Sequence, residues 1–116
     1  MMLDWNAYQA QVAAGVGELG KVSLGTIRGY REMSDAGSKT AVLDAKTREL
    51  IAIAVAVTRQ CDGCITIHTD AAIKHGATKE EIAEALGVAI AVNAGAGLVY
   101  STRVLDAYHA KAPSTA

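Results

Sequence analysis

Aromatic side chains are scarce in this 116-residue chain, which has no phenylalanine, one tryptophan and four tyrosines. Apolar residues still make up 51% of the sequence, and most of them are alanine, valine, isoleucine or leucine. A core of such small side chains suits helices that approach each other closely. The only proline, Pro113, stands near the C-terminus. Proline therefore interrupts none of the helices predicted before it.

The chain also has almost no net charge, because its eleven basic residues nearly cancel its twelve acidic ones. No basic stripe is present that would follow a phosphate backbone or attract an anionic membrane. The composition therefore argues against nucleic acid or a charged membrane surface as the main partner.

Secretion and membrane-spanning signals are missing as well. The first residues, Met1 to Asn6, lack the basic start and apolar run of a signal peptide. The longest nearly apolar stretch, residues 85–100, is shorter than the ~20 residues that a bilayer requires and contains Asn93. We expect a buried helix here, no membrane contact and a cytoplasmic protein.

Apolar residues recur at helical spacing along the chain, and alternation typical of strands is not apparent. The pattern predicts a compact all-α domain of about six helices, without an internal repeat or linker. The expected helices cover residues 5–19, 22–33, 45–57, 61–75, 79–100 and 102–111. We expect one domain over residues 1–116.

Several residues predict where these helices begin and end. Gly20 and the turn-rich residues 34–37 are expected to end the first two helices. Asp44 is a candidate N-cap for the third helix, and Gly76 is typical of the end of the fourth. Thr78 to Glu81 form a capping box that starts the next helix.

Residues 50–57 are apolar without a break. Alanines at every second position within this run favour a helix over a strand, and a helix that is apolar on all sides is expected to be buried on all sides. Glu49 stands directly before the run. On this pattern alone, Glu49 is an ordinary residue near the start of a helix.

Cys61, Cys64 and His68 occupy positions i, i+3 and i+7 at the start of the predicted fourth helix. These positions share one helix face, so the three side chains can meet. Two cysteines at this spacing can close into a disulfide and reopen, and a helix N-terminus favours the thiolate. The sequence therefore predicts a thiol redox centre at the N-terminus of a core helix.

The helix alone does not activate such a thiol. Lowering a cysteine pKa from about 8.5 to roughly 6.5 requires about 2.7 kcal/mol of preferential thiolate stabilisation. A helix dipole commonly supplies about 0.3–1 kcal/mol. His68, one turn beyond Cys64, is the nearest residue that can supply the rest, as an imidazolium or as a base.

Three other interpretations of the same residues remain open at this stage. A structural disulfide closes so short a loop that it stabilises the fold by only about 2 kcal/mol. A zinc site would take Cys61, Cys64, His68 and His75, but His75 lies about two turns beyond His68, too far for one tetrahedral ion. His68 can also be a helix residue without a chemical role.

Three segments together resemble the carboxymuconolactone decarboxylase superfamily, and the resemblance extends over roughly residues 38–110. They are residues 43–52 around Glu49, the Cys61-x-x-Cys64-x-x-x-His68 motif, and residues 76–82 around Glu81. The paired cysteines are typical of the alkylhydroperoxidase D (AhpD)-like branch rather than of the decarboxylase itself. The chain departs from AhpD in having Gly63, where AhpD has a histidine, and in lacking much of its N-terminal extension.

The resemblance implies an all-helical fold, a homotrimer or homohexamer, and unequal roles for the two cysteines. The second cysteine, Cys64, would attack a peroxide and become a sulfenic acid, and Cys61 would resolve it to a disulfide. Glu49 and His68 stand at the offsets of the AhpD proton relay. Glu49 thus becomes a candidate relay residue only through the resemblance.

We therefore expect a thiol-dependent peroxidase with catalytic residues Cys64, Cys61, His68 and Glu49, which uses a lipoyl protein or a thioredoxin-like dithiol as reductant. No metal, flavin or nucleotide is required, because no Gly-rich phosphate loop stands between a strand and a helix. Two alternatives are a thiol–disulfide oxidoreductase or electron relay without peroxidase activity, and a decarboxylase-like lyase.

Overall fold

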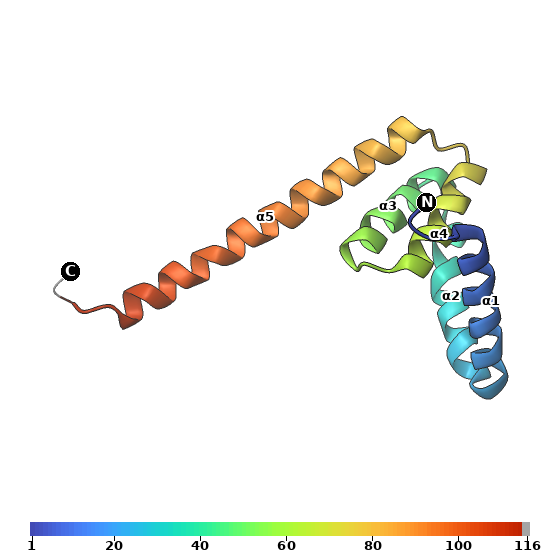
Figure 1. Ribbon diagram of the computed structural model, residues 1–116, viewed down its shortest axis with the longest axis horizontal. Coiled ribbons are helices and arrows are strands. Elements are labelled where there is room, and N and C mark those ends of the chain that lie inside the picture. The colour runs from blue at the N-terminus through green and yellow to red at the C-terminus, as the bar shows by residue number, and fades with distance from the viewer. Residues whose placement is uncertain (115–116) are drawn as a thin grey trace.

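The computed structural model describes residues 1–114, in which all regular secondary structure is helical (Figure 1). The all-α prediction is confirmed, with five helices instead of about six. In chain order the helices are α1 (Trp5–Val22), α2 (Leu24–Thr40), α3 (Ala45–Thr58), α4 (Asp62–Lys74) and α5 (Lys79–Lys111). The two helices expected at the C-terminal end form one, because no residue between them breaks the helix.

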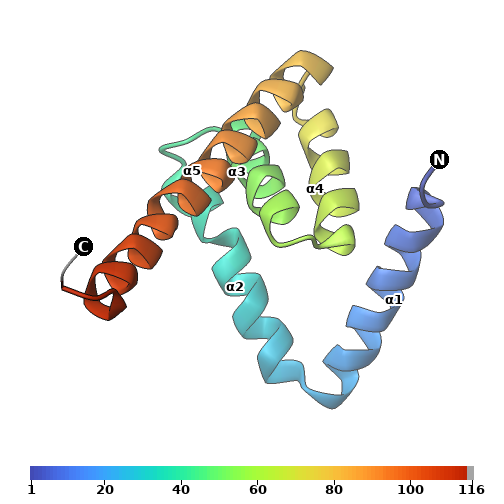
Figure 2. The same cartoon turned by 60° about the vertical axis from the view of Figure 1, so that its left-hand side comes forward.

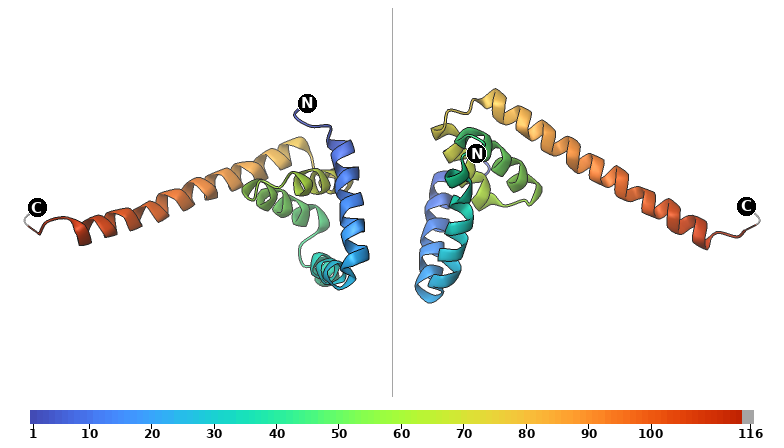
Figure 3. Two further views of the ribbon diagram at one scale, coloured as in Figure 1. Left: turned by 60° about the horizontal axis from the view of Figure 1, so that its bottom comes forward. Right: turned by 180° about the vertical axis from the view of Figure 1, so that it is seen from behind.

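The helices form a V, one packed pair and one long arm. α1 and α2 meet at the turn between them and spread apart as a V that opens toward the other helices, and α3 packs against α4 (Figures 1 and 2). α1 also packs on α4, where the Thr66 hydroxyl donates to the Trp5 carbonyl over 3.2 Å. The start of α5 crosses α3, and the rest of α5 stands clear of the other helices (Figure 3).

The capping predictions are confirmed. The Asp44 carboxylate accepts a hydrogen bond from the Thr47 amide over 2.7 Å. Hydrogen bonding by Thr47, through its side chain foremost and its amide second, lowers the pKa of the Asp44 carboxyl. Thr78 and Glu81 exchange the two bonds of a capping box. The Lys46 ammonium contacts the Glu81 carboxylate at 2.7 Å and is the main reason that the pKa of Glu81 is lowered. This ion pair links the start of α3 to the start of α5.

The first two helices run further than predicted. α1 continues through Gly20 to Val22, and α2 continues through residues 34–37 to Thr40. A Cβ atom at Gly37 would lie 2.8 Å from Cδ of Arg48 in α3. Gly37 therefore lies against the Arg48 side chain and does not end α2.

The structure departs most from the sequence prediction in how few apolar side chains are buried. Among residues 1–114, only five apolar residues are buried, namely Ile27, Ile53, Ala56, Ala72 and Ala89. In α3, Ile51 and Val55 are 49% and 56% exposed, so the expectation that this helix is buried on every side is wrong for the single chain. α4 covers one of its faces and α5 crosses another, and the groove between α3 and α5 stays open.

α5 was expected to be a buried helix over residues 85–100, and this expectation is also wrong for the single chain, because only Ala89 of α5 is buried. The other helices reach only its first half. By its length and composition alone, α5 is long enough and apolar enough to cross a membrane. The radius of gyration is 19.7 Å, against about 13 Å for a compact chain of this length, so the isolated chain is not compact.

α3 and α4 end in the same way, with a residue in the left-handed conformation. Gly76 follows α4 with φ 86°, and Gln60 follows α3 with φ 52°. After α3, the amides of Gln60 and Cys61 donate to the carbonyls of Val57 and Ala56 over 3.2 and 3.1 Å. This pair of bonds is a Schellman motif, which usually has glycine where this chain has Gln60.

We predict opposite stability effects at these two positions. Gly76→Ala should lower the free energy of unfolding by about 1 kcal/mol, because a Cβ atom is disfavoured at positive φ. Gln60→Gly should raise the free energy of unfolding by up to about 1 kcal/mol for the same reason. Urea unfolding followed by circular dichroism, at one fixed protein concentration, measures both. A Gln60→Gly variant less stable than the parent would contradict the argument.

Candidate functional site

The turn between α3 and α4 positions the two cysteines. Because Gln60 turns the chain sharply after α3, Cys61 becomes the N-cap of α4 and Cys64 lies in its first turn. The two residues form a disulfide, with their Cα atoms 5.2 Å apart. The structure thus holds the oxidised form of the predicted cysteine pair.

The two cysteines have different surroundings. The Cys61 sulfur accepts a hydrogen bond from the backbone amide of Cys64 over 3.2 Å, as an N-cap side chain does. Cys64 lines an open pocket, and Cys61 is not among the residues that line it. Negative charge on Cys61 is therefore stabilised by the helix N-terminus, whereas Cys64 is the sulfur that a small molecule in the pocket can reach.

Glu49 and His68 lie on neighbouring helices and meet directly. The Nδ1 atom of His68 lies 2.7 Å from Oε2 of Glu49. An ionised carboxylate only accepts hydrogen bonds, so Nδ1 carries the proton and donates it to Glu49. Both side chains are partly buried, at 28% and 22% exposure. The hydrogen bond fixes the orientation of the imidazole and leaves its Nε2 atom as the second site for a proton.

The pocket brings together residues of three helices and the turn after α3, and it has a volume of about 620 Å³. Cys64 and His68 form its reactive side. The other residues that line it are Met33, Ser34, Ala52, Val55, Ala56 and Arg59. These walls are largely apolar, and an apolar wall limits the access of water to the side of the thiol that it covers.

Most residues of this pocket are not predicted from the sequence. Ala52, Val55, Ala56 and Arg59 recur at helical spacing along α3, so the pattern alone could have placed them on one face. Met33 and Ser34 come from α2, and no sequence signal brings α2 beside Cys64. Arg59 flanks the motif and showed no role in the sequence, although it lines the pocket.

Gly63, the departure from the AhpD pattern, faces away from the pocket. A Cβ atom at this position would contact the Val12 side chain of α1 at 3.5 Å. Val12 does not line the pocket. A side chain at position 63 would therefore point toward α1 and away from the Glu49–His68 pair.

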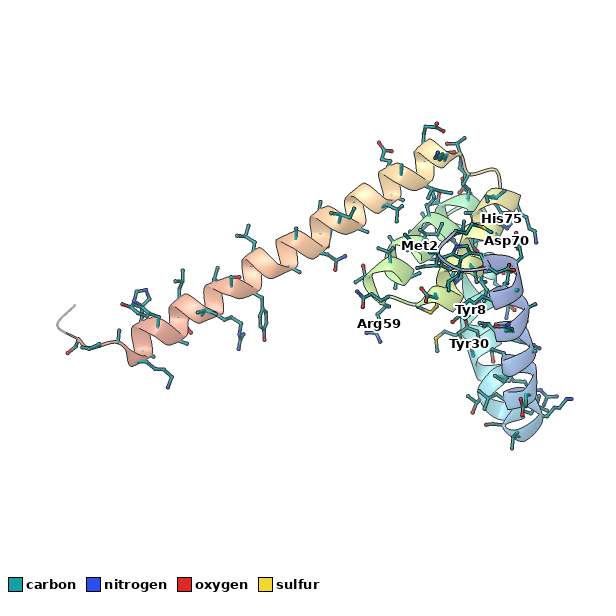
Figure 4. All side chains as sticks on the ribbon, viewed as in Figure 1. Met2, Tyr8, Tyr30, Arg59, Asp70 and His75 are labelled. Atoms are coloured by element: carbon teal, nitrogen blue, oxygen red, sulfur yellow. A yellow bond between two sulfur atoms is a disulfide. The ribbon has the colours of Figure 1, made fainter. Side chains whose placement is uncertain are left out.

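His75, the fourth ligand of the zinc interpretation, lies at the opposite end of α4 from the cysteines. It is the C-cap of that helix, whereas Cys61 is the N-cap. Figure 4 shows His75 and Asp70 together at that end, far from Arg59. Within residues 1–114, no three histidine, cysteine or acidic side chains are grouped so that they could hold a metal ion.

Asp70 belongs to the contact between α4 and α1 and takes no part in the site. Its carboxylate accepts hydrogen bonds from Lys74 over 3.0 Å and from Gln9 over 3.3 Å. These two bonds, that from Lys74 foremost, lower the pKa of Asp70.

The sequence profile of the carboxymuconolactone decarboxylase family matches residues 26–107, which include α3, α4 and the whole pocket. The chain belongs to this family. A carboxymuconolactone decarboxylase family protein from Legionella pneumophila, solved in its apo form, has the same fold with a TM-score of 0.73. The two chains are 32% identical, and the match covers 94% of this chain and 97% of the Legionella protein.

Curated relatives of this family member extend over almost the same length. An uncharacterised protein of Haemophilus influenzae is 48% identical, with 93% of this chain and 96% of the relative covered. An uncharacterised protein of Cupriavidus necator is 31% identical, with 95% and 97% covered. The five-helix chain is therefore close to the full length of these relatives.

The capping role of Cys61 predicts a difference between two substitutions. Under reducing conditions, Cys61→Ala should have a free energy of unfolding about 1 kcal/mol lower than Cys61→Ser, because serine still accepts the Cys64 amide and alanine does not. Urea unfolding with excess reductant, at one protein concentration, measures the difference.

The same pair of substitutions at Cys64 is the matched control. Cys64 lies inside the helix, where alanine is the better helix former, so Cys64→Ala should be at least as stable as Cys64→Ser. Equal stability of Cys61→Ala and Cys61→Ser would show that Cys61 does not act as a cap.

Proposed function

We propose that this family member is a thiol-dependent peroxidase of the AhpD-like type. The observation that supports it most strongly is the pocket in which Cys64 and His68 lie together, with His68 oriented by Glu49 and Cys64 paired to Cys61. A nucleophile, a base held by a third residue, and a second thiol to complete the cycle are the groups that such a reaction needs.

The cycle begins with both cysteines reduced. His68 accepts the proton of the Cys64 thiol, and the thiolate attacks the terminal oxygen of the hydroperoxide. The O–O bond breaks, the sulfur becomes a sulfenic acid, and the leaving alkoxide takes the proton from His68 to form an alcohol. Glu49 keeps the imidazole in place and stabilises its protonated form.

Cys61 then resolves the sulfenic acid. Its thiolate attacks the Cys64 sulfur, a disulfide forms, and hydroxide leaves and becomes water with the Cys61 proton. The peroxide is thus reduced by two electrons, which both come from the cysteine pair. The disulfide in the structure corresponds to this oxidised state.

An external dithiol closes the cycle by exchange. The reductant attacks Cys64, the sulfur that lines the pocket, and Cys61 leaves as a thiolate that the Cys64 amide stabilises. A second exchange releases the oxidised reductant. A lipoyl group or a thioredoxin-like protein supplies a dithiol of this kind.

Thiol–disulfide exchange without peroxide reduction is the second candidate, because it would use the same disulfide and the same leaving thiolate. It predicts transfer of disulfides to a partner and no consumption of peroxide. A lyase of the decarboxylase type predicts instead that both cysteine-to-serine variants keep their activity.

Trapping of a sulfenic acid tests the peroxidase proposal. One equivalent of an organic hydroperoxide, added to reduced Cys61→Ser in the presence of dimedone, should give an adduct on Cys64 that mass spectrometry locates. Cys64→Ser should give no adduct at Cys61 at a comparable rate and should consume no peroxide with dihydrolipoamide as reductant. An adduct on Cys61 would reverse the two roles, and absence of any adduct or peroxide consumption would contradict the proposal.

Glu49→Gln tests the role of the hydrogen bond to His68. We expect the rate constant of sulfenic acid formation to fall about tenfold to a hundredfold, because glutamine does not stabilise an imidazolium. The pH profile of that rate should change as well, which a merely structural role would not cause. Stopped-flow measurement from pH 5 to 9 gives both quantities.

Glu84→Gln on the exposed side of α5 makes the same change of charge outside the site and is the matched control. It should leave the rate and its pH profile unchanged. A Glu49→Gln rate within twofold of the parent would exclude Glu49 from the proton relay.

A further inference from the structure

α5 carries far more exposed apolar surface than a solvated helix needs. Nine of its large apolar side chains between Val88 and Tyr108 are 60–75% exposed. At roughly 100 Å² for each side chain they expose on the order of 900 Å², which is similar to the ~800 Å² that each partner buries in a stable complex. Surface of this extent on one helix indicates that another molecule covers it.

A membrane fits this helix less well than a protein does. The uncharged part of α5, residues 85–102, is about 27 Å long by helix geometry, just short of a ~30 Å hydrocarbon core. Asn93 lies in the middle of this part and donates a hydrogen bond to Thr58 of α3 over 2.8 Å. Lys46 of α3 binds Glu81 at the start of the helix. These bonds keep the first half of α5 on α3.

One side of α5 has the pattern of a helix–helix contact. Six of its residues follow one another at spacings that alternate between four and three. This is the heptad spacing of the residues that form the contact line of a left-handed coiled coil. The α5 seam consists of Val88, Val92, Gly95, Val99, Thr102 and Asp106. The three valines of the seam are exposed, and Gly95 lies between them. A Cβ atom added at Gly95 would meet no other atom within 4 Å.

The α5 seam continues into the groove between α3 and α5. Val88 and Val92 of α5 line this groove on one side. Ile51 and Val55 of α3, and Arg59 directly after α3, line it on the other. Val55 and Arg59 also line the thiol pocket. A molecule that covers the seam therefore borders the thiol pocket as well.

We propose that the α5 seam binds the α5 seam of a second copy of this chain, antiparallel and about a two-fold axis. With the axis midway between Gly95 and Val99, each Val99 faces the Gly95 of the other copy, so that a side chain fills the space a glycine leaves. The same register places Thr102 opposite Val92 and Asp106 opposite Val88. The contact is isologous, and each copy contributes the same residues.

Charge complementarity supports this register. Asp106 of the second copy lies opposite Val88, in the groove that Arg59 also lines. Within residues 1–114, no ion pair includes Arg59 or Asp106. Arg59 extends outward from the turn after α3, where an acidic side chain of a neighbour can reach it (Figure 4). Because of the two-fold symmetry, the pair between Arg59 of one copy and Asp106 of the other occurs twice in each contact.

Two consequences follow from the antiparallel contact. The second copy supplies the missing wall beside Val55 and Arg59, so the thiol pocket is complete only in the assembly. A two-fold contact exists in a dimer and in a hexamer with two-fold axes, but not in a plain trimer. Of the two assemblies that the family resemblance implies, the contact fits the hexamer.

Sedimentation velocity of the full chain tests the inference without any assay of peroxide. The parent should sediment as a dimer or a larger even-numbered assembly at micromolar concentration. Arg59→Glu and Asp106→Arg should each raise the dissociation constant about tenfold or more, because like charges then meet twice per contact. The Arg59→Glu/Asp106→Arg double variant should return it to within about threefold of the parent.

Gly95→Leu provides a second test that does not depend on charge. A leucine fits the isolated chain, where the space around Gly95 is open, and it should dissociate the contact because it meets Val99 of the second copy. Gly97→Leu, equally open but on the other side of α5, is the matched control and should keep the two-fold contact. Circular dichroism checks that both variants are folded.

Four outcomes of the association measurements would overturn the proposal. They are a monomeric parent, a trimeric parent, a charge-swapped double variant no better associated than the single variants, and Gly97→Leu as disruptive as Gly95→Leu. Flotation of the parent with phosphatidylcholine–phosphatidylglycerol vesicles would overturn it in favour of a membrane. These measurements report association alone, and sulfenic acid formation at Cys64 is measured separately, so failure of this proposal can be distinguished from failure of the peroxidase proposal.

Discussion

The hydrogen bond between Glu49 and His68 is the interaction on which the arrangement of the site depends. It joins α3 to α4 at their partly buried contact and gives the imidazole one orientation and one tautomer. Because α4 begins at Cys61, the same helix that carries His68 also sets the position of both sulfurs. A shift of α4 against α3 would therefore change the distance from the base to the nucleophile and the shape of the pocket together.

The small side chains that allow this close packing also leave much apolar surface of the single chain exposed. Small side chains let α3 and α4 approach, but few of them are buried, and α5 has almost no cover. A chain of 116 residues with so little buried apolar surface has little to offset the loss of conformational entropy on folding. Association with further copies would supply the burial that the single chain lacks, and it would do so beside the thiol pocket.

Membership in the carboxymuconolactone decarboxylase family establishes the fold and leaves the chemistry to the site. The curated relatives and the Legionella structure match nearly the whole chain, and their descriptions assign no substrate. The physical case for redox chemistry comes from the unequal surroundings of the two cysteines. Cys61 receives the amide of the helix N-terminus, and Cys64 opens on an apolar pocket beside an oriented histidine.

Features whose causes are local could be predicted from the sequence. Helical periodicity, the Asp44 and Thr78 caps, the glycine after α4 and the spacing of Cys61, Cys64 and His68 all act within a few residues, so a pattern reveals them. Features that depend on packing between helices became visible only in the folded chain. The tertiary structure brought Glu49 to His68, added Met33 and Ser34 of α2 to the pocket, turned Gly37 into a site of close contact with Arg48, and left α5 exposed. Apolar residues show that a helix needs cover, but periodicity within one chain does not say whether that cover comes from the same chain or from another.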